Sequence, residues 1–335
     1  MKCSRRAAVA APALMAATLA ICPVRADDVR LKDWTEHRRP ELIRLFEEYV
    51  FGRTMIGRPK EMPWDVVAED RHAMGGRAIT KTIKLYFSAR KDGPVLELSL
   101  TLPLSNKPVP LFLIAGNARF NPAPVLDRGY GIMACRVDQI QPDDANGYAK
   151  SIRAYFAPPG QTEPGELEWG AIGAWAWGMR RAMDYIEGDT DIDAKKVSIS
   201  GTFRYARVVL WAAAQDPRFA VIFAQEVAGK GILDMVNGKN GYWFDRKLKN
   251  YAGDPDKLPI HWPDLVSLQA PRPVYLSARE IAASQDGGRI YELFGKTGVG
   301  DLIASHAWDG EFGQSKADWE HYLDFAGRHL GIGKK

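Results

Sequence analysis

The chain has 335 residues, 46% of them hydrophobic, and carries 45 Lys and Arg against 41 Asp and Glu, for a formal net charge of +4. A chain of this length can bury a large core. The excess positive charge comes entirely from Lys2, Arg5, Arg6 and Arg25, so the remainder is formally neutral. A neutral chain lacks the basic surface of proteins that bind nucleic acid or anionic membranes, and we expect neither partner.

The first 26 residues have the pattern of an export signal. Basic residues open the segment, an apolar run extends to Ile21, and Val24-Arg25-Ala26 forms a small-residue cleavage site. We therefore predict that residues 1–26 are removed and that the product is periplasmic or secreted. No later segment has the roughly 18 consecutive apolar residues of a membrane-spanning helix, so residues 27–335 are predicted to form a single domain outside the membrane.

One cysteine lies beyond the predicted signal. Cys3 and Cys22 fall within the signal, whereas Cys135 lies in the apolar run "GYGIMACRV". A lone cysteine cannot form an internal disulfide, so stability must come from a packed core. We expect Cys135 to be a buried core residue rather than a catalytic thiol.

The remaining chain begins with a predicted helix over residues 38–52. Alternating apolar residues then predict strands over 64–70, 78–90 and 95–104, which should pair antiparallel. Buried apolar strands separated by helices follow, and this alternation predicts a mainly parallel sheet covered on both faces. These strands are expected at 109–117, 131–137, 197–200, 220–226 and 272–278, with helices at 168–188 and 318–330.

Two tryptophans of the predicted helix 168–188, Trp175 and Trp177, could form a platform for sugar binding. On the same helix, apolar residues recur at the spacing of one helical face. We therefore expect both tryptophans to belong to the core.

The stretch "KKVSISGTFRYARVV" predicts a short strand, a tight turn and a helix. This layout holds the nucleophile of α/β-hydrolases on a strained turn, where small neighbours are needed because the backbone is crowded. Gly201 supplies the small residue two positions before the apex. The apex itself is Phe203, which cannot act as a nucleophile.

Five long stretches of the chain resemble the glucuronoyl esterases of carbohydrate esterase family 15, especially the bacterial members. The resemblance implies an α/β-hydrolase three-layer sandwich, with a mainly parallel central sheet and antiparallel N-terminal strands. It also implies a Ser-His-acid triad that attacks an ester, and a uronic-acid-containing carbohydrate as the partner. The stretches are "RRPELIRLFEEYVFGR", "PPGQTEPGELEWGAIGAWAWGMRRAMDYIEGDTDIDAKKVSISG", "LWAAAQDPRFAVIF", "LPIHWPDLVSLQAPRPVYLSA" and "DWEHYLDFAGRHL".

Two members of this triad are replaced by phenylalanine. The family elbow pattern G-[CH]-S-R-x-G-K resembles residues 201–207, which puts the serine at Phe203. It also implies that Arg204 corresponds to the arginine that helps hold the oxyanion, and Arg207 to the lysine that contacts the sugar. The histidine loop, counted back from Asp318, puts the histidine at Phe312.

The acid has two alternative positions in the family. Glu226 matches the location after the strand that follows the elbow helix. The second location, in the loop after the next strand, reads Glu280-Ile281-Ala282-Ala283-Ser284, where the acid and a substrate-binding tryptophan are both lost. Glu226 is therefore the retained acid position, although a solvated or ion-paired carboxylate at a strand end remains the alternative interpretation.

Three functions are compatible with these residues. The first is an exported esterase homologue without serine-esterase activity, since phenylalanine can neither attack a carbonyl nor accept a proton. The second is an active carboxyl esterase with a reorganised site, in which a hydroxyl or thiol close to His306 acts together with Glu226 and Arg204. The third is a protein that binds uronic acid or glucuronoxylan through Arg204, Arg207 and Glu226.

The sequence shows no pattern typical of a metal site or of a phosphate-binding cofactor site. No H-E-x-x-H pair or phosphate-binding glycine loop is present, so neither a metal site nor a cofactor is predicted. His306 lacks an evident partner in the sequence, and we expect it to be a polar loop residue.

Overall fold

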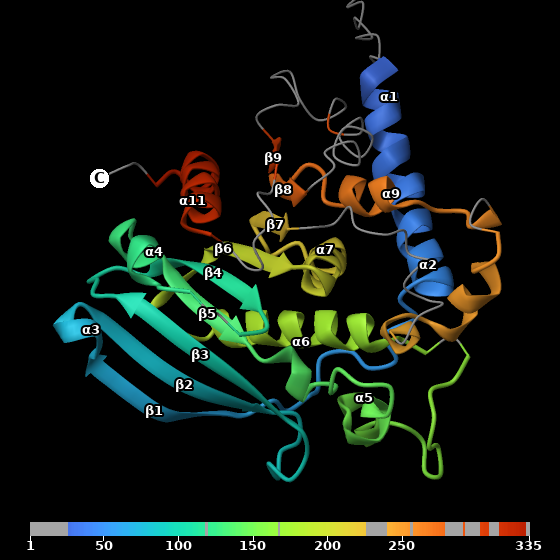
Figure 1. Ribbon diagram of the computed structural model, residues 1–335, viewed down its shortest axis with the longest axis horizontal. Helices are drawn as coiled ribbons and strands as arrows, with labels where there is room; N and C mark the ends of the chain where they lie inside the picture. Colours follow the sequence, from blue (N-terminus) through green and yellow to red (C-terminus); the bar gives the residue numbers. More distant parts are fainter. Residues whose placement is uncertain are drawn as a thin grey trace, which may run out of the picture.

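The computed structural model describes residues 26–117, 120–166, 168–225, 240–254, 257–278, 291, 302–307 and 315–332. Within these residues a nine-stranded sheet forms the centre of the molecule (Figure 1), in the order β1-β2-β3-β5-β4-β6-β7-β8-β9. The strands are β1 (Trp64–His72), β2 (Ala78–Tyr86), β3 (Val95–Pro103), β4 (Val109–Ala115), β5 (Gly131–Cys135), β6 (Ile192–Thr202), β7 (Val221–Gln225), β8 (Val274–Ala278) and β9 (Ile303–Ala307).

The sheet has an antiparallel and a parallel half. Strands β1, β2, β3 and β5 pair antiparallel in sequence, whereas β5, β4, β6, β7, β8 and β9 pair parallel. This confirms the predicted α/β sandwich with antiparallel N-terminal strands. Strand β9 was not predicted, because Ser305 and His306 interrupt the apolar pattern that marks the other parallel strands.

The helices and helical turns follow the predicted order. The helix predicted at 38–52 is observed as α2, and it is preceded by helical turns that the sequence did not predict. The α-helices are α1 (Ala26–Asp33), α2 (Arg39–Tyr49), α3 (Ala73–Gly76), α4 (Ala123–Asp127), α5 (Ile152–Tyr155), α6 (Ala171–Ile186), α7 (Arg204–Gln215), α9 (Trp262–Ser267) and α11 (Lys316–Leu330). A π-helical turn covers Trp34–Arg38, and 3-10 turns cover Val137–Gln139, Gly147–Lys150, Gly241–Trp243 and Arg246–Tyr251.

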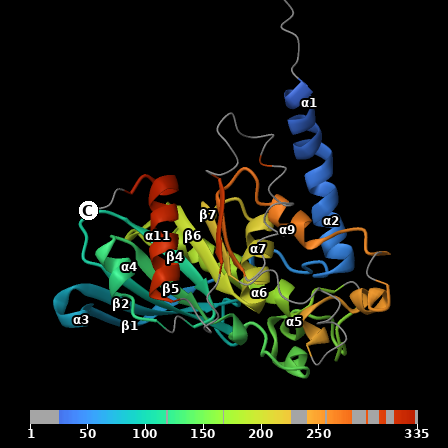
Figure 2. The same cartoon turned by 45° about the horizontal axis from the view of Figure 1, so that its top comes forward.

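Alternate residues of the central strands point to opposite faces of the sheet, and each face is covered by helices. In β4, Leu111 and Leu113 join the larger core beneath α6 and α7, whereas Phe112 and Ile114 join a second core beneath α11. Figures 1 and 2 show α11 and α4 on one side of the sheet and α6 on the other. Side chains at the carboxyl ends of β7 and β8 therefore face α11 at every second residue.

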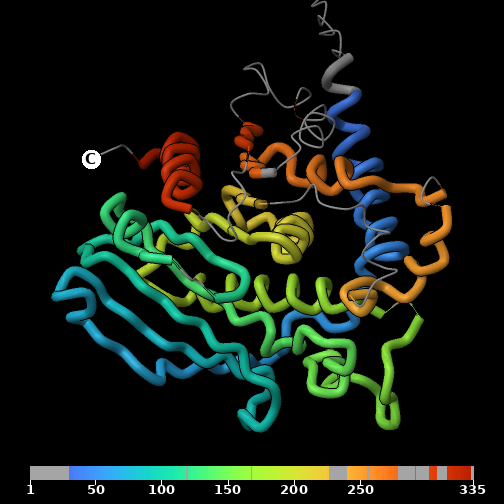
Figure 3. Tube along the Cα trace, in the orientation of Figure 1, coloured from blue at the N-terminus to red at the C-terminus, as the bar shows by residue number. Residues whose placement is uncertain are grey.

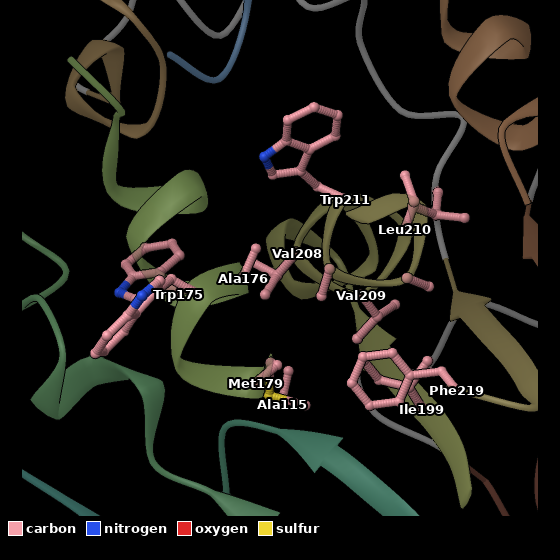
Figure 4. Close-up of a cluster of buried hydrophobic side chains, with 14 of the residues drawn as sticks. Ala115, Trp175, Ala176, Met179, Ile199, Val208, Val209, Leu210, Trp211 and Phe219 are labelled. Atoms are coloured by element: carbon pink, nitrogen blue, oxygen red, sulfur yellow. The ribbon is translucent and has the colours of Figure 1, made fainter. Parts of the chain in front are cut away.

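The elbow helix α7 is buried along most of its length. The ring centroid of Trp211 lies 6.0 Å from that of Phe46 and 4.9 Å from that of Phe51. These contacts pack α7 against α2 and the residues that follow it. Figure 4 shows Trp211 together with Val209, Phe219 and residues of α6 in this core. The Cα trace in Figure 3 shows α2 running beside the segment that holds the 3-10 turn Arg246–Tyr251. There Tyr49 packs edge-on against Tyr251, with ring centroids 5.7 Å apart.

The expected core residues are buried. Trp175 and Trp177 expose 0% and 1% of their surface, and their indole nitrogens donate to the carbonyls of Gln141 and Gly57. Cys135 is also fully buried, and burial raises the pKa of its thiol, which makes it unreactive. Among the described helices, none combines the length and the apolar character needed to cross a membrane.

Candidate functional site

The turn from β6 to α7 has the strained backbone of a nucleophile elbow. Phe203 at its apex has φ 53° and ψ −122°, a conformation that residues other than glycine adopt at a cost of about 1–3 kcal/mol. The Phe203 amide donates to the carbonyl of Gln225 at 3.1 Å, and the Phe203 carbonyl accepts from the Ala206 amide at 3.0 Å. The backbone geometry of the elbow is thus retained, although its apex carries phenylalanine.

Glycine is required two residues before the apex. A Cβ atom at position 201 would lie 2.3 Å from the carbonyl oxygen of Tyr205 and 3.0 Å from a methyl group of Val209. Side chains larger than hydrogen would therefore collide with the first turn of α7. This close approach explains why position 201 is glycine, the feature from which the sequence analysis predicted an elbow.

Arg204, the residue after the apex, is held by an aspartate from a distant loop. Its Nε lies 2.8 Å from Asp143 Oδ2. The other oxygen of Asp143 accepts hydrogen bonds from the Tyr242 hydroxyl and the Trp243 indole, each at 2.7 Å. The positive charge of Arg204 is therefore matched locally by a carboxylate.

The ring of Tyr205 fills the space between the elbow and the end of β4. The Arg204 guanidinium lies over this ring, 4.5 Å from its centroid. The ring also contacts Gly116, where a Cβ atom would lie 2.7 Å from Tyr205 Cε2. In α/β-hydrolases the loop after this strand supplies an oxyanion donor, so here an aromatic ring lies beside that position.

Arg207 lies inside the protein. It exposes only 3% of its surface, and its guanidinium lies 4.8 Å from the ring centroid of Trp262 in α9. The stacking of an arginine on tryptophan is a favourable cation–π contact. In this arrangement Arg207 packs against a core-facing helix.

Two predicted site residues, Phe312 and Glu226, lie outside the described residues, as does the segment 280–284. The family resemblance implies that Phe203, Phe312 and Glu226 lie close together, and this stays a prediction.

His306 is neither a loop residue nor without partners, so the expectation from the sequence was wrong on both points. It lies in β9, and its Nε2 is 2.6 Å from Asp318 Oδ1 at the start of α11. Its Nδ1 is 3.1 Å from the Tyr275 hydroxyl, and the Ser277 hydroxyl lies 3.3 Å from Nε2. The partners come from β8 and α11, which the fold brings beside β9.

The array Ser277-His306-Asp318 contains the residue types of a catalytic triad in a different arrangement. In a triad the base receives the nucleophile's proton on one ring nitrogen and is oriented by the acid through the other. Here Ser277 and Asp318 both approach Nε2 of His306. Ser277 is also fully buried, which keeps an ester carbonyl away from its hydroxyl. The array therefore links β8, β9 and α11 without the geometry for nucleophilic attack.

Asp318 is ionised in this array. Burial on its own would raise the pKa of Asp318, but hydrogen bonds from His306 and Ser315 outweigh burial and hold the pKa below its usual value. Asp318 also forms a capping box with Ser315, accepting from its amide at 2.8 Å and its hydroxyl at 3.0 Å. Within the described part of the chain, no three His, Cys, Asp or Glu side chains gather as metal ligands.

Comparisons with known proteins identify the family. The family described as "Glucuronyl esterase, fungi" matches residues 88–286. The Carbohydrate esterase MZ0003 of an unknown prokaryotic organism is 30% identical, over 89% of this chain and 86% of that protein. The chain belongs to the glucuronoyl esterase family.

Solved structures agree with this family membership. A glucuronoyl esterase from Solibacter usitatus superposes with a TM-score of 0.84 at 31% identity, covering 90% of this chain and 94% of that one. A promiscuous CE15 esterase from a marine bacterial metagenome superposes with a TM-score of 0.77 at 29% identity, over 89% of this chain and 92% of that one. The glucuronoyl esterase fold is therefore present across most of the chain.

Proposed function

We propose that this chain is an exported glucuronoyl esterase homologue that has lost serine-esterase activity. The observation that supports the proposal is the elbow, where Phe203 has the strained backbone of a nucleophile but offers no hydroxyl. Loss of one triad member removes most of the rate enhancement of a serine hydrolase. The family resemblance puts a second phenylalanine, Phe312, at the position of the base, and the pattern of residues 1–26 supports export.

The test is hydrolysis of a benzyl or methyl ester of glucuronic acid by the purified protein. We expect a rate equal to that of buffer, with the Solibacter usitatus enzyme assayed beside it as a positive control. Turnover by the wild type at a rate near that of the control would contradict the proposal.

An active esterase with a reorganised site is the second candidate, and one observation favours it. A hydroxyl, that of Ser277, does lie near His306 as this hypothesis requires. Its burial and the shared Nε2 contact argue against attack on an ester. Ser277→Ala decides between the two proposals. If a reorganised site hydrolyses the ester, the wild type turns over and the variant does not. If the chain has lost esterase activity, wild type and variant both give the rate of buffer.

A further inference from the structure

The segment 241–251 packs against the end of α2 and the start of α6 (Figure 1). The Asp245 amide donates to the carbonyl of Val50, the residue that ends α2, at 2.8 Å. Gly170 lies directly before α6, and a Cβ atom there would lie 2.4 Å from the carbonyl oxygen of Trp243. The segment is therefore docked on both helices by close backbone contacts.

Two aromatic residues of this segment hold the aspartate that pairs with Arg204. The Tyr242 hydroxyl and the Trp243 indole both donate to Oδ1 of Asp143, while Arg204 Nε lies 2.8 Å from Oδ2. Burial and the Asp143 carboxylate raise the pKa of Tyr242, so its hydroxyl remains a donor at neutral pH. The position of Arg204 beside the elbow thus depends on a segment about 40 residues further along the chain.

The residue that follows these aromatics by two positions, Asp245, is a buried acid. It exposes 1% of its surface. Its Oδ1 accepts from the Lys247 amide at 2.6 Å, whereas its Oδ2 is buried without a hydrogen-bond partner. The ammonium group of Lys247 pairs with Glu48 of α2 instead, at 3.0 Å. Ionisation of Asp245 therefore leaves charge on a buried oxygen that has no donor, which is destabilising.

The charged groups around Asp245 do not compensate for its burial. Burial raises the pKa of Asp245 to about 6, although the amide and ammonium groups of Lys247 and the Arg153 guanidinium lower it. The Glu166 carboxylate raises it further, and Arg153 is itself shared with Glu168, 3.7 Å away.

Release of the segment would bring Asp245 into water, where an aspartate has a pKa of about 3.9. The docked segment therefore holds its proton more tightly than the released one. Docking is then strongest below about pH 3.9, weakens as pH rises to about 6, and levels off above it.

We propose that residues 241–251 form a pH-responsive latch on Arg204. While Asp245 is protonated, the segment is docked, and Tyr242 and Trp243 fix the Asp143 carboxylate. When Asp245 is ionised, the segment opens more often, both donors leave Asp143, and Arg204 loses the partner that held it. The latch acts through Asp143 and needs no contact between Asp245 and the elbow.

Hydrogen exchange of the purified protein, followed by mass spectrometry at pH 4.5 and 7.5, tests the latch. After correction for the intrinsic pH dependence of exchange, the amides of 241–251 should lose protection by roughly 25-fold in the wild type as pH rises, because docked and released segments differ in the pKa of Asp245. Asp245→Asn should remove this change. Asp254→Asn is the matched control, since Asp254 pairs with Lys257 at an exposed site and should behave like the wild type.

Chemical modification tests the link to Arg204. Phenylglyoxal reacts with accessible guanidinium groups, and peptide mass spectrometry locates the modified residues. At pH 7.5, Arg204 should react several times faster in the wild type than in Asp245→Asn, because only the wild type then carries a buried charge in the segment. Arg90, with 84% of its side chain exposed, is the internal reference and should react equally in both proteins.

Three results would overturn the proposal. They are protection of the segment that does not change with pH in the wild type, the same change in Asp245→Asn, or equal modification of Arg204 in both proteins. Segment amides as strongly protected as those of α6 at both pH values would also overturn it, since exchange then requires unfolding of the whole domain.

Thermal melting shows whether each variant is folded. If Asp245→Asn does not fold, the pH dependence of exchange in the wild type decides the result. No esterase assay enters these measurements, so their outcome is independent of the proposed loss of esterase activity.

Discussion

His306 Nε2 lies 2.6 Å from Asp318 Oδ1, and this contact joins the last strand of the sheet to the first turn of the last helix. Asp318 exposes 3% of its surface, so the contact is shielded from solvent. A buried hydrogen bond to a charged group contributes about 1.5–3 kcal/mol to stability. The histidine at this end of the sheet therefore has a structural role.

We expect Asp318→Asn to destabilise the fold by about 1.5–3 kcal/mol at pH 7. The pKa of Asp318 is held below its usual value, so its contribution is fully present above the unfolded pKa of about 3.9 and is lost as pH falls through the lower folded-state pKa. Urea denaturation at pH 7 and near pH 3 should show the difference shrinking at acid pH. Asp324→Asn on the same helix is the control, because Asp324 forms a part-exposed pair with Arg128. An equal loss in both variants would contradict this role for Asp318.

Gly201→Ala should disrupt the elbow. The added Cβ would lie 2.3 Å from a backbone oxygen of α7, which cannot move without shifting the helix. We expect a loss of about 3 kcal/mol or more, at the upper end for point mutations. Gly253→Ala is the control, because a Cβ there would meet no atom within 4 Å. Thermal melting that shows the same midpoint for both variants would show that the elbow is not tightly packed.

Asp245 should make the fold less stable as pH rises from about 4 to 6. Burial raises the pKa of Asp245 to about 6. One oxygen of its carboxylate accepts a hydrogen bond from the Lys247 amide, and the other has no hydrogen-bond partner. The folded chain therefore holds a proton that the unfolded chain releases near pH 3.9, so stability falls across this window and then levels off.

Asp245→Asn should remove this pH dependence, worth on the order of 3 kcal/mol between pH 4 and 7. The measurement is the free energy of unfolding of wild type and variant at several pH values. Asp254→Asn, at an exposed ion pair with Lys257, should leave the dependence unchanged. Parallel curves for wild type and Asp245→Asn would rule out Asp245 as its source.

Restoring the two lost triad members should restore weak esterase activity. At the positions that the family resemblance gives to the triad, Phe203→Ser with Phe312→His supplies a serine and a base, with Glu226 at the expected position of the acid and Arg204 beside the elbow. An oxyanion donor is typically worth about 2.7–4 kcal/mol. Each single substitution should be inactive, since neither a serine without a base nor a base without a nucleophile can work by this mechanism.

The activity of the double variant should be low, because Tyr205 and Ala206 depart from the family elbow pattern and Ser284 stands where the family resemblance expects a substrate-binding tryptophan. A displacement of about 1 Å can reduce the rate roughly a hundredfold. Hydrolysis of a glucuronate benzyl ester by all four proteins measures the effect, with Phe203→Ala plus Phe312→His as a control. Wild-type activity equal to that of the double variant would show that the chain never depended on these positions.

The sequence predicted the parts of the fold that depend on local pattern. Continuous apolar runs predicted β4, β5, β7 and β8. Gly201 indicated the elbow because close packing against α7 leaves no room for a side chain there. Strand β9 was not predicted because Ser305 and His306 interrupt its apolar pattern, although it is as long as β5, β7 and β8. Its contacts with Ser277 and Asp318 depend on the alignment of neighbouring strands, which no short window of sequence reveals.

The contacts of Arg204 could not be predicted from the sequence either. The family resemblance identified the arginine, but its partner Asp143 lies in a loop far away in sequence, and Tyr242 and Trp243 reach that aspartate from about 100 residues further along the chain. Such loop contacts follow from tertiary packing.

The retained shape of the elbow makes position 203 a usable site for engineered chemistry. Packing around Gly201 and α7 holds the backbone there with φ 53° while a phenylalanine occupies the apex. A cysteine introduced by Phe203→Cys would stand at the amino end of α7, where the helix dipole favours the thiolate. Its alkylation by iodoacetamide should therefore be faster than that of a surface cysteine, whereas the buried Cys135 should remain unmodified.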